Sequence, residues 1–361
     1  MHPHRIIWAT FAMIVAVLVL GTAEAQEITD CFYLKSLHYT ARGMAYWYEA
    51  EQGGLETLTG VPYDSLGCKG CHNGCCDQCH KAETTEGDCK VAAYSTNAAN
   101  SLSMCLKCHA REKSMIAIDH KAQQDDVHVA QGMVCTDCHS AREMHGDGNE
   151  YVSMKQPGAM ETMCEDCHDE VKPTEAHTVH KDRLECKACH VRHVVSCTNC
   201  HFDTMVKKGE RKARPVHDWV FLMNYEDKVT SANMQTFVVG ENKTFLMFAP
   251  HMSHSIMNPG RGCDACHGTE IVDQVRKGAL KLTWAKGGKL ESLKGAIPVV
   301  DGVDYQCAYD NFVDGKWVPI ANPPRPSVQY VGYGTPLSKE QLAKMAEKQE
   351  THPVIIPQPK K

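Results

Sequence analysis

The sequence predicts a fold of mostly short α-helices and coil, with minor β-hairpins in the C-terminal third. Two observations predict it. The pattern Cys-x-x-Cys-His occurs eight times between residues 68 and 267, which leaves 25 residues for each copy and too little polypeptide for an ordinary side-chain core. The β-rich runs with Gly or Asn turns lie after the seventh copy. Up to residue 267, we therefore expect short helices and coil that pack around bound groups rather than around a core of side chains.

Every Cys-x-x-Cys pair in the chain is followed directly by His. Histidine makes up only 21 of 361 residues, so chance does not explain eight such matches. The motif cysteines are Cys68 and Cys71, Cys76 and Cys79, Cys105 and Cys108, Cys135 and Cys138, Cys164 and Cys167, Cys186 and Cys189, Cys197 and Cys200, and Cys263 and Cys266. The motif histidines are His72, His80, His109, His139, His168, His190, His201 and His267.

This spacing has a direct chemical meaning. Two cysteines three apart can add to the two vinyl groups of one haem, and the next His then lies beneath the iron as its ligand. Zinc is the rival, since it also binds Cys and His, but a zinc site gathers four ligands and does not require His directly after the second Cys. Iron–sulfur clusters fail by the same test. The sequence thus predicts a multihaem cytochrome c with eight covalently attached haems c, stacked so closely that the haems themselves form the core.

The second axial ligand decides what each haem can do, because an iron with two protein ligands is closed to substrates. Setting aside the motif residues, His2 and His4 near the N-terminus and His352 near the C-terminus, ten histidines remain for eight positions. These candidate ligands are His38, His120, His128, His145, His177, His180, His193, His217, His251 and His254. No haem is therefore forced to be open. Methionines near the motifs are interpreted as packing residues rather than ligands.

Four cysteines lie outside the standard motifs: Cys31, Cys75, Cys89 and Cys307. An even number in an exported protein favours disulfides, with three possible connectivities. The pairs Cys75–Cys89 and Cys31–Cys307 are weakly preferred. Attachment through Cys75 and Cys79 is conceivable, but the standard spacing is favoured.

The N-terminus resembles an export signal. A basic start precedes the apolar run from Ile6 to Leu20, and Ala23-Glu24-Ala25 has the form of a cleavage site, so residues 1–25 are predicted to be removed. The alternative is an uncleaved anchor, but the run is short for a bilayer span. No later segment is apolar enough to span a membrane, so a periplasmic or extracellular location is expected. The net charge of −6, to which haem propionates add, argues against nucleic-acid binding.

Four regions follow from this pattern. The signal peptide 1–25 precedes an N-terminal pre-haem segment, 26–67, and the octahaem domain, 68–267. That domain includes an insertion at 202–262, where 235–248 is predicted to form a hairpin. The haem-free C-terminal segment, 268–361, contains a second expected hairpin at 280–293. It also contains a capping box, Ser338 to Gln341, which opens a short helix.

Residues 68–267, with segments such as His128-Val-Ala-Gln-Gly-Met-Val-Cys135 and Met144-His-Gly-Asp-Gly148, resemble the octahaem cytochrome superfamily. That group includes tetrathionate reductase-like and hydroxylamine oxidoreductase-like proteins together with electron-carrying relatives. The resemblance implies haem attachment outside the cytoplasm. Catalytic members keep one haem with a special distal residue, and no residue of this chain aligns to that role.

Two functions are compatible with these features. The favoured one is electron transfer along closely packed haems in an anaerobic-type respiratory chain, from a membrane quinol-oxidising donor or to a periplasmic or extracellular acceptor protein. The alternative is an oxidoreductase that acts on a small nitrogen or sulfur compound at one open haem. Its expected location is near His217 and Asp218, an imidazole beside a carboxylate, although haem ligation by His217 is the simpler interpretation. The sequence leaves the oligomeric state open.

Overall fold

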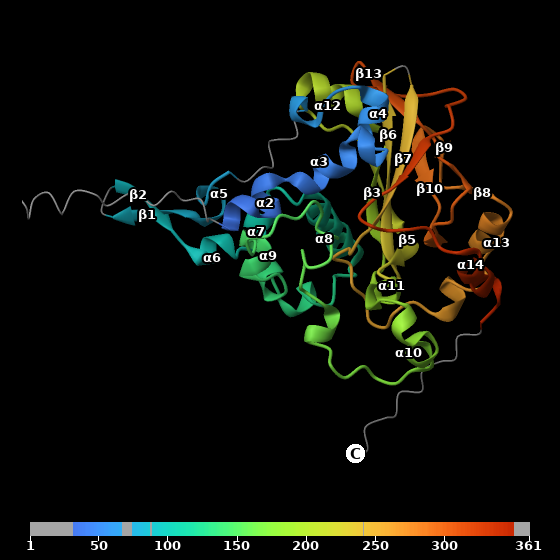
Figure 1. The fold of residues 1–361 in the computed structure, drawn as a ribbon, viewed down its shortest axis with the longest axis horizontal. Coiled ribbons are helices and arrows are strands. Elements are labelled where there is room, and N and C mark those ends of the chain that lie inside the picture. The colour runs from blue at the N-terminus through green and yellow to red at the C-terminus, as the bar shows by residue number, and fades with distance from the viewer. Residues whose placement is uncertain (1–31, 67–73, 87–88, 241, 350–361) are drawn as a thin grey trace, which may run out of the picture.

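The structure is a computed structural model that describes residues 32–66, 74–86, 89–240 and 242–349. The chain divides into a part made of short helices and a part built on a β-sheet (Figure 1). Helices α2 (Leu37–Thr40) and α5 (Asp77–His80) to α9 (Ala141–His145) lie on one side, whereas α4 (Glu56–Thr59) lies beside the strands of the main sheet on the other. The first motif, Cys68 to His72, lies outside the described residues.

The helical part consists of short elements joined by coil, as predicted. The longest helix, α8, has 13 residues. The α-helices of this part are α2 (Leu37–Thr40), α3 (Arg42–Tyr48), α4 (Glu56–Thr59), α5 (Asp77–His80), α6 (Thr96–Ala99), α7 (Leu102–Cys105), α8 (Ala110–Ala122), α9 (Ala141–His145), α10 (Glu175–His180) and α11 (Cys186–His190). The 3₁₀ turns are η1 (Phe32–Lys35), η2 (Ala50–Gln52), η3 (Tyr63–Ser65), η5 (Val129–Gln131), η6 (Cys135–Asp137), η7 (Cys164–Asp166) and η8 (Lys181–Arg183). Strands β1 (Lys81–Glu86) and β2 (Cys89–Tyr94) form an antiparallel hairpin within it.

Local sequence explains where several of these helices begin. Ser36, Ser140 and Thr174 each accept a hydrogen bond from a backbone N–H in the first turn of α2, α9 and α10. Such caps satisfy N–H groups that have no partner inside the helix. Helices this short are not stable alone, so their positions depend on what they pack against.

The main sheet has seven strands, and it is larger than the minor hairpins that the sequence predicted. Its backbone order is β11-β5-β6-β7-β15, with β3 paired to β5 and β4 paired to β6. The strands are β3 (Val194–Thr198), β4 (Cys200–His201), β5 (Arg214–Tyr225), β6 (Lys228–Val239), β7 (Lys243–Pro250), β11 (Gly295–Pro298) and β15 (Ser327–Tyr330). The sheet therefore takes strands from both the 202–262 insertion and the C-terminal segment.

A conventional hydrophobic core holds this sheet, contrary to the expectation that side chains play little part before residue 268. The run from Trp219 to Met223 is buried on both faces of β5. It packs with Phe248 of β7 and Val272 of α13 (Glu270–Arg276). Both faces are covered, so the strand is continuously apolar rather than alternating, and this pattern was missed in the sequence.

Both predicted hairpins are present. β6 and β7 pair antiparallel, with Val239 opposite Lys243, and β9 (Thr283–Lys286) pairs with β10 (Lys289–Ser292). The predicted capping box at Ser338 and Gln341 opens α14 (Lys339–Ala346). The remaining elements are α12 (Phe202–Lys208), η9 (Cys263–Ala265), β8 (Ala279–Lys281), β12 (Asp304–Gln306), β13 (Asp310–Val313) and β14 (Lys316–Pro319). Among the described residues, no helix has the length and apolar character that a membrane crossing requires.

Candidate functional site

Six motif histidines each face one histidine from elsewhere in the chain. The two ring centroids of every such pair are 6.0 to 6.3 Å apart. The pairs are His80 with His145, His109 with His38, His139 with His254, His168 with His128, His190 with His177, and His267 with His180. Six of the ten candidate ligands thus lie opposite a motif histidine.

This separation has the size that a shared metal ion requires. An imidazole nitrogen binds a metal at about 2 Å, so two rings on opposite sides of one ion have centroids about 6 Å apart. Rings packed directly against each other lie closer, at about 4.5 Å for the tightest aromatic pairs. The spacing fits imidazoles that flank the iron of a haem.

Hydrogen bonds at Nδ1 fix the direction of several of these rings. Nδ1 of His190 and of His267 lies 3.0 Å from the carbonyl oxygens of Met257 and Lys344, respectively. In α10, Nδ1 of His180 lies 3.0 Å from the Ala176 carbonyl oxygen. Each N–H donates to its carbonyl, so Nε2 keeps its lone pair and is the nitrogen available for a metal.

Two pairs have a carboxylate at Nδ1 instead, Glu143 at His139 and, at 3.2 Å, Asp126 at His128. The Nδ1–H of His139 donates to Glu143 Oε2 at 2.7 Å, and the Glu143 side chain is fully buried. Burial opposes ionisation of Glu143, but hydrogen bonds from His139, Thr162 and the Glu161 backbone outweigh it and lower the pKa of this carboxyl. The position was missed in the sequence. Its signal is the spacing of four residues after His139, one helical turn away.

Burial also keeps several partner rings neutral. It is the main cause that lowers the pKa of His38, His180 and His254 below the ordinary value for histidine. A neutral ring keeps a lone pair for a metal, whereas a protonated ring has none. The electrostatics therefore agree with the geometry of the pairs.

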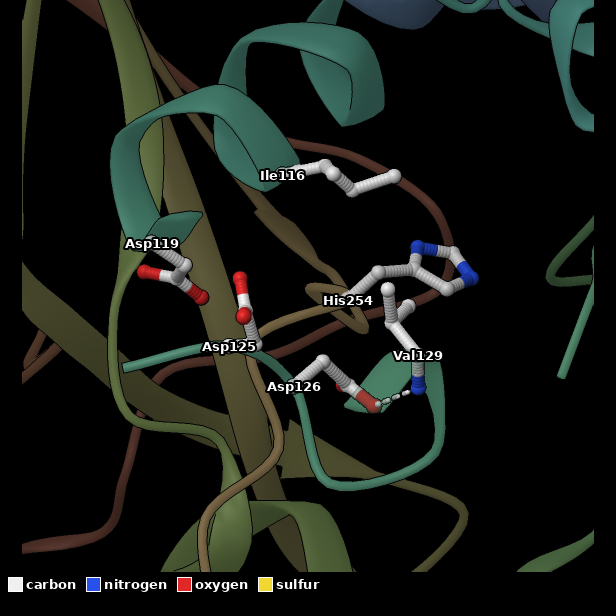
Figure 2. A pocket seen from close by; sticks show the side chains of 6 residues that line it. All are labelled: Ile116, Asp119, Asp125, Asp126, Val129 and His254. Atoms are coloured by element: carbon white, nitrogen blue, oxygen red, sulfur yellow. Dashed lines mark hydrogen bonds between the residues drawn. The ribbon is translucent and has the colours of Figure 1, made fainter. Parts of the chain in front are cut away.

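A second buried carboxylate, Asp126, joins the segments of two partner histidines. Figure 2 shows it beside Val129 and His254 in a small pocket. Asp126 Oδ1 accepts hydrogen bonds from the backbone N–H groups of His128 at 2.8 Å and Val129 at 3.3 Å, and Oδ2 accepts from Ile256 at 2.7 Å. One side chain thereby positions the loop of His128 against the segment of His254.

Successive motifs lie next to one another. The thiols of Cys105 and Cys135 are hydrogen-bonded, and so are those of Cys164 and Cys186. Further thiols interact electrostatically: Cys138 with Cys167, and Cys189 with Cys263. His145 faces the second motif histidine and His38 faces the third, and these two rings also interact electrostatically. The second, third, fourth, fifth, sixth and eighth motifs therefore form one continuous series.

The seventh motif is built differently. Its residues belong to strands of the sheet, and His201 and Cys200 are buried. His201 Nδ1 lies 2.6 Å from Thr204 Oγ1, and His201 Nε2 lies 2.7 Å from Asn311 Oδ1. The ring beside it is Phe312, at 6.2 Å. As arranged, these residues do not fit a two-histidine iron site, because His201 Nε2, the nitrogen that would bind iron, is hydrogen-bonded to the Asn311 side-chain amide.

The remaining candidate ligands are placed as follows. His120 is exposed, with Nδ1 3.2 Å from Asp125 Oδ1. Burial lowers the pKa of His251 well below its ordinary value. Neither faces a motif ring within the part of the chain that the structure describes, and His72 lies outside it. His193 and His217 lie 5.6 Å apart and face each other rather than a motif histidine.

The predicted Cys75–Cys89 and Cys31–Cys307 disulfides each involve one cysteine whose side chain lies outside the described residues. Of their partners, Cys75 is exposed and Cys307 is partly buried. Burial raises the pKa of Cys307 to about 12, which keeps it protonated. Cys31 and the side chain of Cys89 lie outside the described residues.

Comparison with known proteins identifies one region. A family model for cytochrome c7 and related cytochrome c matches residues 121–191. This part of the chain is therefore similar to multihaem c-type cytochromes. The match covers three motif histidines, His139, His168 and His190, and four candidate ligands outside the motifs, which are His128, His145, His177 and His180. No curated protein and no solved structure matches the chain. The match supports a multihaem cytochrome that transfers electrons.

Proposed function

We propose that this chain is an exported octahaem c-type cytochrome that transfers electrons along closely packed haems in an anaerobic-type respiratory chain. The observation that carries the proposal is the series of six facing histidine pairs. Each pair lies at a Cys-x-x-Cys-His motif, and neighbouring motifs are in contact.

Haem iron, when bound, supplies one-electron redox chemistry, and an iron with two histidine ligands stays closed to substrates. The residues of this chain would supply two things. The motif and partner histidines would hold both axial positions, and their Nδ1 partners would keep the rings in place. Contact between successive motifs would keep neighbouring haems close, which favours transfer along the series over chemistry at any one member.

The partners we propose are redox proteins: a membrane quinol-oxidising donor and a periplasmic or extracellular acceptor. The net charge of −6, before haem propionates are counted, favours partners that present a positively charged surface. Removal of residues 1–25 and location outside the cytoplasm are part of this proposal.

Mass spectrometry and electron paramagnetic resonance of the purified, oxidised protein test it together. The expected mass is that of the chain from Gln26 with eight haems, and the haems should survive acid–acetone extraction. The expected spectrum is low-spin for every haem of the six pairs. Fewer than eight covalent haems, or high-spin iron at several of the six pairs, would contradict the proposal.

The alternative function is an oxidoreductase that uses one open haem, and the seventh motif is the observation in its favour. His201 has no histidine opposite it in the described part of the chain, and Asn311 and Phe312 lie there instead. An iron at this motif would require the Asn311 amide to move, and its second position would face β13 rather than an imidazole.

Ligand titration separates the two functions. The oxidised protein is mixed with hydroxylamine, nitrite, sulfite or tetrathionate, and the visible spectrum and turnover with a reduced dye are followed. An electron carrier should show no turnover and no spectral change. Turnover that is lost in Asn311→Leu but retained in Asn242→Leu, a change at its hydrogen-bonding neighbour, would favour the oxidoreductase.

A further inference from the structure

His193, His217 and Asp218 form a cluster outside the haem series. His193 lies between α11 and β3, and His217 and Asp218 are adjacent in β5. One side-chain ligand atom from each of the three lies within 4.8 Å of the other two. Neither histidine follows a Cys-x-x-Cys pair, whereas a haem c iron takes the histidine of its own motif.

His193 is held in a form that suits a metal. Its Nε2 lies 2.8 Å from Asp119 Oδ1, and Arg192 Nη1 holds the other Asp119 oxygen at 3.2 Å. The carboxylate takes the Nε2–H, so the lone pair is on Nδ1. That nitrogen is buried without a hydrogen-bond partner, on a side chain that is only 6% exposed. A carboxylate behind an imidazole is the usual support of a metal-binding histidine.

The backbone of β5 explains how its two ligands reach one point. Consecutive residues of a regular strand point to opposite faces. Asp218 has a φ of 73°, in the left-handed region, and this conformation breaks the alternation. His217 Nδ1 and Asp218 Oδ1 thereby come to 2.7 Å. Such strain in a non-glycine residue needs a surrounding structure that holds it.

The His193–His217 geometry differs from that of the haem pairs. The centroids are 5.6 Å apart with the rings at 49°, closer than the 6.0 to 6.3 Å of the six pairs. Two imidazoles on opposite sides of an ion have centroids about 6 Å apart. The shorter centroid distance between His193 and His217 fits two imidazoles that bind an ion at a bent angle, which leaves room for a third ligand. Tetrahedral zinc sites have this bend.

We propose that His193, His217 and Asp218 form a mononuclear, non-haem site for a divalent first-row transition metal such as Zn²⁺ or Fe²⁺. Two imidazoles and one carboxylate are a ligand set that these ions prefer, and three protein ligands leave a further position for water or another small ligand. The site ties Asp119 of α8, through His193, to strand β5, and so connects the helical part to the sheet.

One charged group opposes the ion. Lys294 Nζ lies 2.9 Å from Asp218 Oδ2, and this lysine side chain is 72% exposed. The ammonium competes with a cation for the same carboxylate, but it uses the oxygen that His217 does not contact. Removal of the Lys294 amine should therefore strengthen metal binding. If the three side chains only stabilised the fold, this substitution would not create tighter metal binding.

The test uses the purified haem-loaded protein after chelation, with Zn²⁺ as the probe, isothermal titration calorimetry, and metal analysis after dialysis. The expected result is one Zn²⁺ per chain. His217→Ala and Asp218→Asn should each weaken binding at least 10-fold, Asp119→Asn should weaken it by about 10–100-fold, and Lys294→Gln should tighten it. His120→Ala, which removes an exposed histidine beside Asp125, is the control and should change nothing.

Electron paramagnetic resonance of His217→Ala separates this inference from the proposed electron transfer. The number of low-spin haems should be unchanged, because His217 is not an axial ligand. A new high-spin haem in this variant, or no Zn²⁺ binding, or equal Zn²⁺ affinity in His217→Ala and the unmodified protein, would overturn the metal site. None of these results would by itself disturb the six histidine pairs.

Discussion

At the scale of single residues, the histidine pairs differ mainly in what their Nδ1 atoms contact. Most rings with a resolved partner donate to a backbone carbonyl. His139 instead donates to the buried carboxylate of Glu143 at 2.7 Å, and the other carboxylate, Asp126, lies farther from its ring, at 3.2 Å from His128 Nδ1. A full negative charge on the acceptor increases the electron density of the ring, and this favours the more oxidised iron. Among haems with two histidine ligands, the haem of the fourth motif should therefore have a lower reduction potential.

Glu143→Gln tests this expectation. The amide is isosteric but carries no charge, and its single acceptor oxygen is needed by the backbone N–H groups of Glu161 and Thr162. His139 therefore loses its charged acceptor, and the potential of one haem should rise. A 10-fold change in the one-electron equilibrium corresponds to about 59 mV, and a shift of this order is expected in a spectroelectrochemical titration. Glu112→Gln is the matched control, because Glu112 Oε2 lies 4.0 Å from His109 Nδ1, beyond hydrogen-bond distance. Equal shifts in both variants would contradict the role of Glu143.

Lys155 gives a prediction for pH. Burial lowers its pKa to about 8, and its Nζ lies 5.5 Å from the centre of the Tyr225 ring. The folded pKa is below the ordinary value of 10.5, so between these values the unfolded chain binds more protons than the folded one. The free energy of unfolding should then rise with pH across this window, by at most about 1.4 kcal/mol per unit.

Denaturant unfolding at pH 7.5 and 9.5 measures this contribution. Lys155→Met keeps the apolar stem and removes the amine, so the gain at the higher pH should be smaller than in the unmodified protein. Lys316→Met, at a position exposed on β14, should leave the gain as it is. If Lys155→Met retains the full increase, the shifted amine is not its source.

At the scale of elements, single short segments hold more than one histidine of the series. Helix α10 presents His177 and His180, three residues apart and so on one face, to the sixth and eighth motifs. The loop after α8 supplies His128, and Asp126 fastens this loop to the segment that supplies His254. The segments of His128 and His254 have little secondary structure of their own, so the buried carboxylate of Asp126 fixes their relative position.

Asp126→Ala should therefore affect two haems together. The backbone N–H groups of His128, Val129 and Ile256 lose their acceptor, and an unsatisfied buried group costs about 1–3 kcal/mol. Movement of His128 and His254 should appear as high-spin signal from two haems in electron paramagnetic resonance. Asp125→Ala is the control. Among the contacts described, the neighbouring Asp125 side chain is hydrogen-bonded only to exposed His120, so this variant should keep the low-spin spectrum. A change at one haem alone would show that Asp126 does not couple the two segments.

At the scale of the whole molecule, two kinds of packing coexist. The helical part follows the series of histidine pairs, whereas the sheet has a core of ordinary side chains around Trp219, Phe221 and Phe248 (Figure 1). Phe221 is fully buried, with ring centroids 5.0 Å from Trp219 and 5.5 Å from Phe248. Loss of that core should weaken the sheet without direct damage to the pairs.

Phe221→Ala tests this separation. Truncation of a buried phenylalanine costs about 3–5 kcal/mol, so the sheet should unfold at lower denaturant concentration, as followed by tryptophan fluorescence. The low-spin haem spectrum at 25 °C in the absence of denaturant should stay as in the unmodified protein. Val318→Ala, at a site that is 46% exposed, is the control and should change stability by less than about 0.5 kcal/mol. Loss of low-spin haem in Phe221→Ala without denaturant would show that the two parts depend on each other.

Local sequence is enough to predict the chemistry of the motifs, because thioether attachment and the adjacent iron ligand depend on residues only one to four positions apart. It also determined the two hairpins and the Ser338 capping box, whose signals are local. The pool of spare histidines could be named for the same reason, and six of them face a motif ring.

Which histidine faces which motif is visible only in the folded chain, since the partners come from 13 to 115 positions away in either direction and no local pattern encodes that distance. It also decided that His193 and His217 meet each other, through a left-handed Asp218 that sequence spacing does not reveal. The extent of the sheet was missed because β5 is apolar on both faces, and such a run acquires its meaning only when later segments of the chain cover it. Glu143 and Asp126 became visible as positioning residues for a related reason: burial and hydrogen-bond partners are properties of the folded chain.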